Sequence, residues 1–401
     1  MREKSKKQSL IFVLAVLLLS SLLKGQEVKK QTGKKFYNEK EVWTTPIKSQ
    51  GETGLCALFS DMSFLESELH RLGRGNFELS TMYVAYYFYI EKALRRIRLR
   101  GKKDFGFNGG FNYDAFEMIK KYGIAQSSDY TGLLPGHTEH NHFKFIKEMN
   151  IYLDEVEKDG QDGKLNSQWK DGKFYCPWLK NIKKTLNQNM GVPPAAIEYK
   201  KKVMSPIQFS EDILLIPYDD YIKITSYSYI GFNRKGELLA DGNWLHKKDF
   251  YNIRLDEYIS LIDHALKNGF SLTGDFHITE ELYKSKQGYA DFQLDNSNTK
   301  INQNIRDNLY ENWKTNDVHN VHIIGIARDE NGKKYYKIKD SVPTKVFPHS
   351  PTYFSENYFR ARVLAVMLHK DGIPFEIRKR LKINKKYLSK PESAKTPHFT
   401  R

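Results

Sequence analysis

The sequence predicts an α+β fold in two lobes, with helices early in the chain and antiparallel strands late. In the N-terminal part, apolar residues recur at the three- and four-residue spacing of helices. After about residue 315 the pattern changes to strands, and Asp329–Gly332 is typical of a hairpin turn. Between these parts, about 126–255 contains Gly-rich turns and Lys runs, which we interpret as an insertion decorated with loops.

Three helices are predicted in the N-terminal lobe. The first spans about 56–72, where one apolar stripe is formed by Leu58, Met62, Leu65, Leu69 and Leu72. The second spans about 80–99, with Ser80 as N-cap, and the third spans 112–122 and ends at Gly123.

The C-terminal lobe is predicted to combine two helices with several strands. The helices are expected at 255–268 and 301–313. The strands are expected at 270–273, 321–327, 334–339 and 362–369.

The first 25 residues have the pattern of a signal peptide. A basic start precedes an apolar run, Leu10–Leu23, that is shorter than the roughly 20 residues needed to span a bilayer. We expect cleavage near Gly25–Gln26 and export to the periplasm or medium, with an uncleaved N-terminal anchor as the alternative. Residues 26–41 are then expected to be a linker.

The net charge of +16 does not indicate a nucleic-acid partner, because the excess is concentrated at the two ends. About half of it lies in residues 378–401 and about a quarter in residues 1–25. Residues 376–401 are predicted to be a disordered basic tail. No zinc-finger, RNA-binding or helix-turn-helix pattern is present in the sequence.

Cys56 lies at the predicted start of the first helix, in the segment Ser49–Cys56. A cysteine attacks as thiolate, and the partial positive charge at a helix N-terminus favours that form. Gly51 and Gly54 allow the backbone to approach a substrate, and Gln50 is placed to donate its amide to an oxyanion. The alternative for Cys56 is a disulfide with Cys176, the second cysteine of the chain.

The segment Gln50–Cys56 resembles the nucleophile motif of papain-like cysteine peptidases, and Phe107–Gly110 resembles the Asn-Gly-Gly loop of their substrate cleft. The runs Phe64–Leu69, Asp114–Ala115 and Ile119–Gly123 resemble the bacterial bleomycin hydrolase branch, which includes aminopeptidase C.

This resemblance implies a papain-like two-lobe peptidase domain over 42–375, with a helical left lobe, a β-rich right lobe and the active-site cleft between them. It further implies that Gly109 and Gly110 bind the backbone of a peptide or protein substrate. It implies no metal and no organic cofactor, and oligomeric state stays open.

The resemblance assigns the base to His319, which opens a predicted strand and precedes Gly325 by six positions, as in the family. Alternation along that strand places His322 on the opposite face, and we expect it to point into the lobe core. The third catalytic residue, usually Asn, is replaced by Asp340, whose charge is expected to strengthen the thiolate–imidazolium pair.

Three further positions depart from the family pattern. Ala57 replaces the usual Trp after the nucleophile, and Val342–Pro343 replaces the Trp-Gly after the orienting residue. The prediction is therefore a cysteine peptidase, an aminopeptidase or endopeptidase, with a catalytically weak or inactive papain-like peptide-binding protein as the alternative.

Two other groups of residues contain side chains that can bind metals or act as a catalytic pair. His137, His140 and His142 lie in a polar loop, where solvated side chains are more common than a zinc site. Asp275 and His277 alternate along a predicted strand, and a core or surface pair is the simpler interpretation.

Overall fold

The structure is a computed structural model that describes residues 34–101, 107, 109–170, 173–278, 288–294, 299–342 and 352–383. The chain divides into two compact units, Met1–Lys35 and Phe36–Arg401, and all features below belong to the second. The predicted signal peptide, residues 1–25, lies outside the described residues, which begin at residue 34. No helix in the described ranges has the length and apolar character required to cross a membrane.

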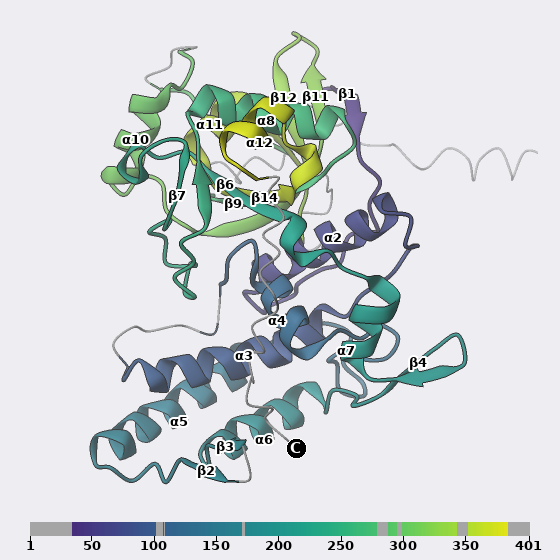
Figure 1. The fold of residues 1–401 in the computed structure, drawn as a ribbon, viewed down its shortest axis with the longest axis vertical. Coiled ribbons are helices and arrows are strands. Elements are labelled where there is room, and N and C mark those ends of the chain that lie inside the picture. Colours follow the sequence, from purple (N-terminus) through teal and green to yellow (C-terminus); the bar gives the residue numbers. More distant parts are fainter. Residues whose placement is uncertain are drawn as a thin grey trace, which may run out of the picture. The chain divides into compact units, whose positions relative to one another are not determined.

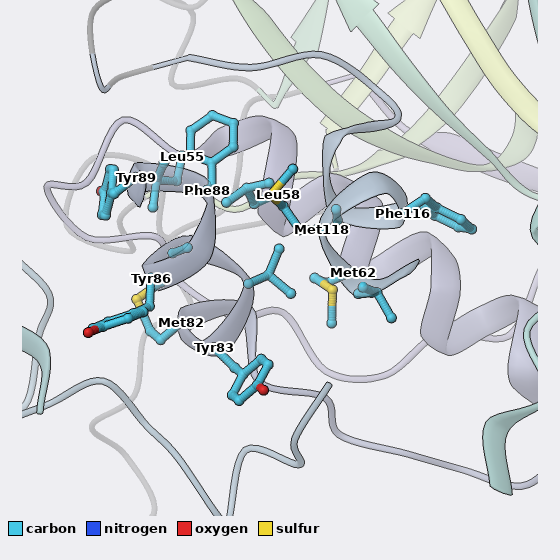
Figure 2. Packing of buried hydrophobic residues seen from close by; sticks show 14 of the residues in the cluster. Leu55, Leu58, Met62, Met82, Tyr83, Tyr86, Phe88, Tyr89, Phe116 and Met118 are labelled. Atoms are coloured by element: carbon cyan, nitrogen blue, oxygen red, sulfur yellow. The ribbon is translucent and has the colours of Figure 1, made fainter. Parts of the chain in front are cut away.

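The N-terminal lobe is helical, as predicted. Its principal helices are α2 (Cys56–Arg71), α3 (Thr81–Arg98), α4 (Asp114–Tyr122), α5 (Phe143–Gln161) and α6 (Leu179–Met190). Figure 2 shows side chains of α2, α3 and α4, among them Leu58, Phe88 and Met118, pointing toward one another in the core of this lobe. The predicted ends of α2, α3 and α4 agree with the structure to within two residues, and the Ser80 side chain accepts a hydrogen bond from the Tyr83 amide.

The C-terminal lobe is built on a mostly antiparallel sheet. In the described part of the chain ten strands join it, in the order β10-β13-β12-β11-β9-β14-β6-β8-β7, with β1 added on β11. In chain order the strands are β1 (Phe36–Glu41), β6 (Tyr221–Thr225), β7 (Arg234–Gly236), β8 (Phe250–Asn252), β9 (Leu272–Phe276), β10 (Tyr289–Ala290), β11 (His319–Asp329), β12 (Lys334–Lys339), β13 (Thr352–Ser355) and β14 (Val363–His369).

Each face of this sheet contacts different helices. One face buries a second apolar core with residues of α8 (Leu255–Lys267), α11 (Glu356–Arg362) and α12 (Phe375–Arg380), and α10 (Gln303–Glu311) packs on α11. The other face, at β9 and β11, packs against α2. In Figure 1, α2 lies between the strands and the helices α3, α5 and α6. Two apolar cores joined through α2 confirm the two-lobe α+β prediction.

The orientation of β11 differs from the prediction for His322. Val321 and Ile323 face the second apolar core, whereas His322 points to α2, where its Nδ1 atom lies 2.9 Å from the Ser63 hydroxyl oxygen. The alternation itself was predicted correctly, but both faces of this strand are buried, so the sequence pattern could not show which face meets which lobe.

Three predicted boundaries need correction. The expected linker at 26–41 contains β1, whose backbone pairs with β11 although its side chains are mostly exposed. The expected tail at 376–401 begins with most of α12, and its residues from 384 onward lie outside the described part. The expected insertion at 126–255 contributes β6 and β8 to the central sheet and α5 and α6 to the helical core.

The insertion also contains short elements that complete the element order. These are β2 (Gln168–Lys170), β3 (Lys173–Tyr175), β4 (Ile197–Tyr199), β5 (Lys202–Met204), α7 (Pro206–Gln208) and the helical turns η1 (Phe209–Leu214), η2 (Tyr218–Asp220) and η3 (Ser228–Ile230). A further turn, η4 (Lys370–Gly372), follows β14.

Candidate active site

Cys56 is the first residue of α2, at the junction of the two lobes. Its side chain is buried, and neither Leu55 nor an acidic residue of the first turn caps the helix. The first backbone N–H groups of α2 therefore retain their partial positive charge near the sulfur. Cys56 and Cys176 are both free thiols, so the disulfide alternative is not what the structure shows.

The loop before Cys56 is held by hydrogen bonds to two separate segments. The amide of Gln50 donates to the carbonyl of Ser341 over 2.8 Å, which ties this loop to the β-rich lobe. Glu52 exchanges two backbone bonds with the 140–142 segment, donating to His140 over 2.8 Å and accepting from His142 over 3.0 Å. The loop is thus positioned before any substrate arrives, as an oxyanion-binding element requires.

Gly51 has a specific structural reason to be glycine. Its φ is +56°, and a Cβ atom at this position would collide with the carbonyl oxygen of His140. The sequence analysis predicts that Gly51 lets the backbone approach a substrate. In the structure, glycine is required here by a close backbone contact within the protein.

His319 and Asp340 lie together on neighbouring strands. His319 opens β11, Asp340 follows the end of β12, and the two strands pair antiparallel. The Nε2 atom of His319 lies 2.8 Å from Oδ1 of Asp340, which also accepts a 2.7 Å hydrogen bond from the amide of Ser341. Asp340 is therefore held by the Ser341 amide as well as by the imidazole.

The imidazole of His319 also hydrogen-bonds to the side chain of Cys56. Because Nε2 faces Asp340, the ring presents Nδ1 to the sulfur. The structure thus brings together a thiol from the helical lobe with an imidazole and a carboxylate from the β-rich lobe. These residues are the ones predicted from the sequence as nucleophile, base and orienting group.

The electrostatics at His319 favour the imidazolium. Burial disfavours its charge, but the carboxylate of Asp340 and the neighbouring Cys56 outweigh that effect and raise the pKa of His319 well above its usual value. A protonated imidazole is the partner that stabilises a thiolate and can later donate a proton to a leaving amine.

Gln50 is buried close to this group through its backbone bond to Ser341. Its Oε1 atom has no hydrogen-bond partner among the described residues. A buried amide without a bonded oxygen is an unusual arrangement in a folded protein, and such groups are frequent at functional sites. Binding an oxyanion would use the Nε2–H donors of Gln50 and not this oxygen, so that role stays a prediction.

Gly109 and Gly110 border the start of α2. The Gly109 amide donates to the carbonyl of Gly54 over 2.9 Å, and its φ is +72°. A Cβ atom at Gly110 would lie 3.2 Å from the Cβ of Ala57 and 2.8 Å from a carboxylate oxygen of Asp114. The pair therefore lies beside the nucleophile, while Asn108 of the same predicted motif lies outside the described residues.

The structure places three carboxyl groups near the site that were not predicted as part of it. Asp275 on β9 is fully buried, and both Asp275 and Asp61 on α2 have pKa values raised by burial, with the charge of Cys56 contributing. Asp317 lies two residues before His319 and hydrogen-bonds to Asp275. No spacing rule signals this group, because its members come from segments far apart in the chain.

The rival clusters do not form sites of the kinds considered. No group of three metal-ligating side chains suited to an ion occurs in the part of the chain that the structure describes. His142 instead lies 2.7 Å from the Tyr89 hydroxyl, and burial, with repulsion from His140, lowers its pKa to about 3. His277 lies beyond the end of β9, where its Nδ1 accepts from the Asn316 amide.

Comparison with known proteins supports the fold. No protein-family model matches the chain. Its sequence is similar to aminopeptidase G of Lactobacillus delbrueckii subsp. lactis, with 22% identity over an alignment of 368 positions that covers 82% of each protein. Its structure resembles the crystal structure of PepW from Lactobacillus rhamnosis, with a TM-score of 0.66 and 18% identity over 94% of both chains. Bromelain of Ananas comosus, in complex with E64, matches at a TM-score of 0.34 over 80% of this chain and 92% of bromelain, with 14% identity. The similarity to PepW shows a shared fold over nearly the whole chain.

Proposed function

We propose that this chain, a peptidase of the papain-like cysteine peptidase superfamily in its bleomycin hydrolase and aminopeptidase C-like branch, cleaves peptide bonds with Cys56, His319 and Asp340 as its triad. The observation that carries the proposal is the position of His319, which bonds to Asp340 on one side and to Cys56 on the other. This is the arrangement that activates a nucleophile through a base held by a third group.

The reaction begins with attack of the Cys56 thiolate on the carbonyl carbon of the scissile peptide. The oxygen that becomes negative accepts hydrogen bonds from the Cys56 amide and the Gln50 side-chain amide. The His319 imidazolium then donates its proton to the leaving amine, and the C–N bond breaks to leave a thioester. Neutral His319 removes a proton from water, which hydrolyses the thioester and restores the thiolate–imidazolium pair.

Asp340 in place of the usual Asn is compatible with this chemistry. Its carboxylate accepts the Nε2–H bond over 2.8 Å, so the ring is oriented as an amide oxygen would orient it. The negative charge adds to the stability of the imidazolium. The positions that surround the triad, Ala57 and Val342, lack the aromatic side chains of the family pattern, and we expect this to make the site more accessible to water.

The experiment that tests the proposal compares wild-type protein with Cys56→Ala on a mixed peptide library. Wild type should cleave peptides and Cys56→Ala should not, while Cys176→Ala is the matched control that removes the other thiol and retains activity. The same proteins are then treated with iodoacetamide between about pH 5 and 9. Cys56 should react rapidly at about pH 5–6, where an ordinary thiol is largely unreactive.

Two outcomes would contradict the proposal. If Cys56 reacts slowly below about pH 8 and no peptide is cleaved, the chain is instead a papain-like peptide-binding protein. If activity persists in Cys56→Ala, the nucleophile lies elsewhere.

We also propose that residues 1–25 direct export and that the mature protein begins near Gln26. The support is the basic start followed by the short apolar run Leu10–Leu23. Expression of the full chain in a bacterial host, with N-terminal sequencing of the exported protein, tests this. A protein that remains in the cell with residues 1–25 attached would contradict it.

A further inference from the structure

A small polar cavity lies between α2 and the β-rich lobe, behind the catalytic carboxylate. Its volume is about 20 Å³, which is room for one water-sized occupant. Lys48 and Ser63 are partly exposed, and the other residues of its wall are buried. The wall consists of Lys48, Phe59, Ser60, Met62, Ser63, Glu66, Thr81, Asn320, Lys339, Asp340 and Ser341.

Lys339 contributes an ammonium group to this wall. The residue is only 7% exposed, and its Nζ donates to the Thr45 hydroxyl oxygen over 3.1 Å. Burial lowers the pKa of Lys339 to about 8, because the attraction of Glu66 is opposed by repulsion from Lys48 and does not offset the loss of solvent. A buried positive charge is costly unless an anion lies beside it.

The two carboxylates of the wall pair with other cations. Glu66 lies 2.5 Å from the ammonium of Lys48, and Asp340 lies 2.8 Å from the imidazole of His319, whose pKa is raised. Among the described residues Lys339 forms no direct ion pair of this kind. Once the two pairs are formed, the charge of Lys339 is the one that stays unbalanced in this wall.

The wall is also rich in hydrogen-bond donors. Oγ1 of Thr81 and Oγ of Ser341 are buried and have no hydrogen-bond partner among the described residues, and the same holds for one acceptor, Oδ1 of Asn320. Thr81 is the first residue of α3, whose first turn contains no acidic side chain, so the partial positive charge of this helix end adds to that of Lys339. A water molecule can accept some of these bonds, but only an anion also balances the charge.

Ser341 connects the cavity to the catalytic groups. Its amide donates to Oδ1 of Asp340 over 2.7 Å, and its carbonyl accepts from the Gln50 amide over 2.8 Å. An occupant that holds the Ser341 hydroxyl would therefore steady both the orienting carboxylate and the loop that contains Gln50.

We propose that this cavity binds a small monovalent anion, chloride, between the Lys339 ammonium and the Ser341 hydroxyl, and that the bound ion steadies the active site. A cavity of this size admits one small ion and not sulfate, phosphate or a substrate carboxylate. Binding of the ion does not depend on the proposed peptidase function, whereas its effect on the reaction rate rests on that function.

The first test compares wild type in sodium chloride and in sodium gluconate at equal ionic strength, since gluconate is too large for the cavity. Saturating chloride should raise the melting temperature by about 5 °C, because a ligand that binds only the folded state stabilises it. It should also raise kcat/KM about tenfold, because small displacements of catalytic groups cost at least this much.

The variant Lys339→Met removes the ammonium and retains an unbranched side chain, so both chloride effects should disappear. Lys223→Met is the matched control. Lys223 is also buried, at 8% exposure, but it pairs with Asp249 over 2.8 Å and is not part of the cavity wall, so both chloride effects should persist in this control. If Lys339→Met does not fold, Ser341→Ala provides a second variant, in which the half-saturating chloride concentration should rise about tenfold.

Crystals of wild type prepared with bromide provide a direct measurement. Bromide has the same charge as chloride, and its anomalous scattering should give a peak in the cavity next to Lys339. Crystals of Lys339→Met should give no peak there. A peak without any change in melting temperature would show an adventitious ion only, which would overturn the proposal.

The other outcomes are equally decisive. Equal melting temperatures in the two salts, with no bromide peak, would show that the cavity binds only water. A chloride effect that persists in Lys339→Met would place the site elsewhere. Stabilisation by chloride without a change in rate, in a protein that cleaves peptides, would overturn the role of the ion in the active site. If wild type cleaves no peptide but is stabilised through Lys339, the anion site stands and the peptidase proposal fails.

Discussion

The Nε2 atom of His319 lies 2.8 Å from Oδ1 of Asp340, while the same ring hydrogen-bonds to Cys56. The imidazole is thus held between a fixed carboxylate and a thiol from the opposite lobe. The charge of Asp340, together with Cys56, raises the pKa of His319 despite burial, so removing the Asp340 charge should narrow the pH range of the imidazolium.

We predict that Asp340→Asn is active, and that its activity declines at a lower pH than that of wild type when the pH is raised. The amide oxygen can still accept from Nε2, whereas the lost charge lets the pKa of His319 fall. Because activity needs the imidazolium and disappears as pH rises through that pKa, the alkaline limb of kcat/KM moves to lower pH. Asp340→Ala should cost about 10²-fold at every pH because the ring is no longer oriented. An unshifted alkaline limb in Asp340→Asn would contradict this.

We predict that Gln50→Ala lowers kcat by about 10²-fold with little change in KM, because an oxyanion donor acts in the transition state. The rate of Cys56 alkylation should stay as in wild type, because the role proposed for Gln50 is to bind the oxyanion and not to stabilise the thiolate. Stopped-flow alkylation and steady-state kinetics on one preparation provide both measurements. A parallel fall in alkylation and kcat would indicate that the loop has moved.

His142 should make the stability of the protein depend on pH. Burial, with repulsion from His140, lowers the pKa of His142 to about 3 from its usual 6.5. The unfolded chain therefore binds a proton that the folded chain excludes between these values. Stability from this residue is complete above about pH 6.5 and is lost as pH falls toward 3, by about 1.4 kcal/mol for each unit within that range.

The measurement is the free energy of urea unfolding at pH 7 and pH 4.5, in wild type and in His142→Gln. Wild type should lose about 2.5 kcal/mol more than the variant over this interval. The variant will be less stable at pH 7, since the bond between His142 and the Tyr89 hydroxyl is replaced. Equal losses of stability in both proteins would show that a residue other than His142 causes the pH dependence.

Arg306 is predicted to be essential for the stability of the β-rich lobe. Its fully buried guanidinium donates to the carbonyls of Ser226, Arg360 and Val363, and it lies 4.4 Å from the centre of the Tyr227 ring. Arg306→Lys cannot reach all three acceptors and should destabilise the fold by about 3 kcal/mol. Arg234→Lys, at an exposed position on β7, should change stability by less than about 0.5 kcal/mol. Urea unfolding measures both variants.

Several parts of the site could be predicted from local sequence. The apolar stripe that begins beside Cys56 predicted α2, and the turn at Asp329–Gly332 predicted a strand at 321–327, which in the structure is part of β11. These patterns repeat every few residues, so they can be recognised in a single sequence without knowledge of the tertiary contacts. The strand β1 could not be found in this way, because its side chains are largely exposed and it is held by backbone pairing.

By itself, then, the sequence determined the helical and β-rich parts and placed Cys56 at a helix N-terminus, while the resemblance to papain-like peptidases assigned His319 and Asp340. Only the tertiary structure decided that His322 faces α2, that Asp275 and Asp317 share a buried position near Cys56, and that Gly242 lies against Gly110. The physical reason is that periodicity is a property of neighbouring residues, whereas burial and charge depend on contacts between segments hundreds of positions apart.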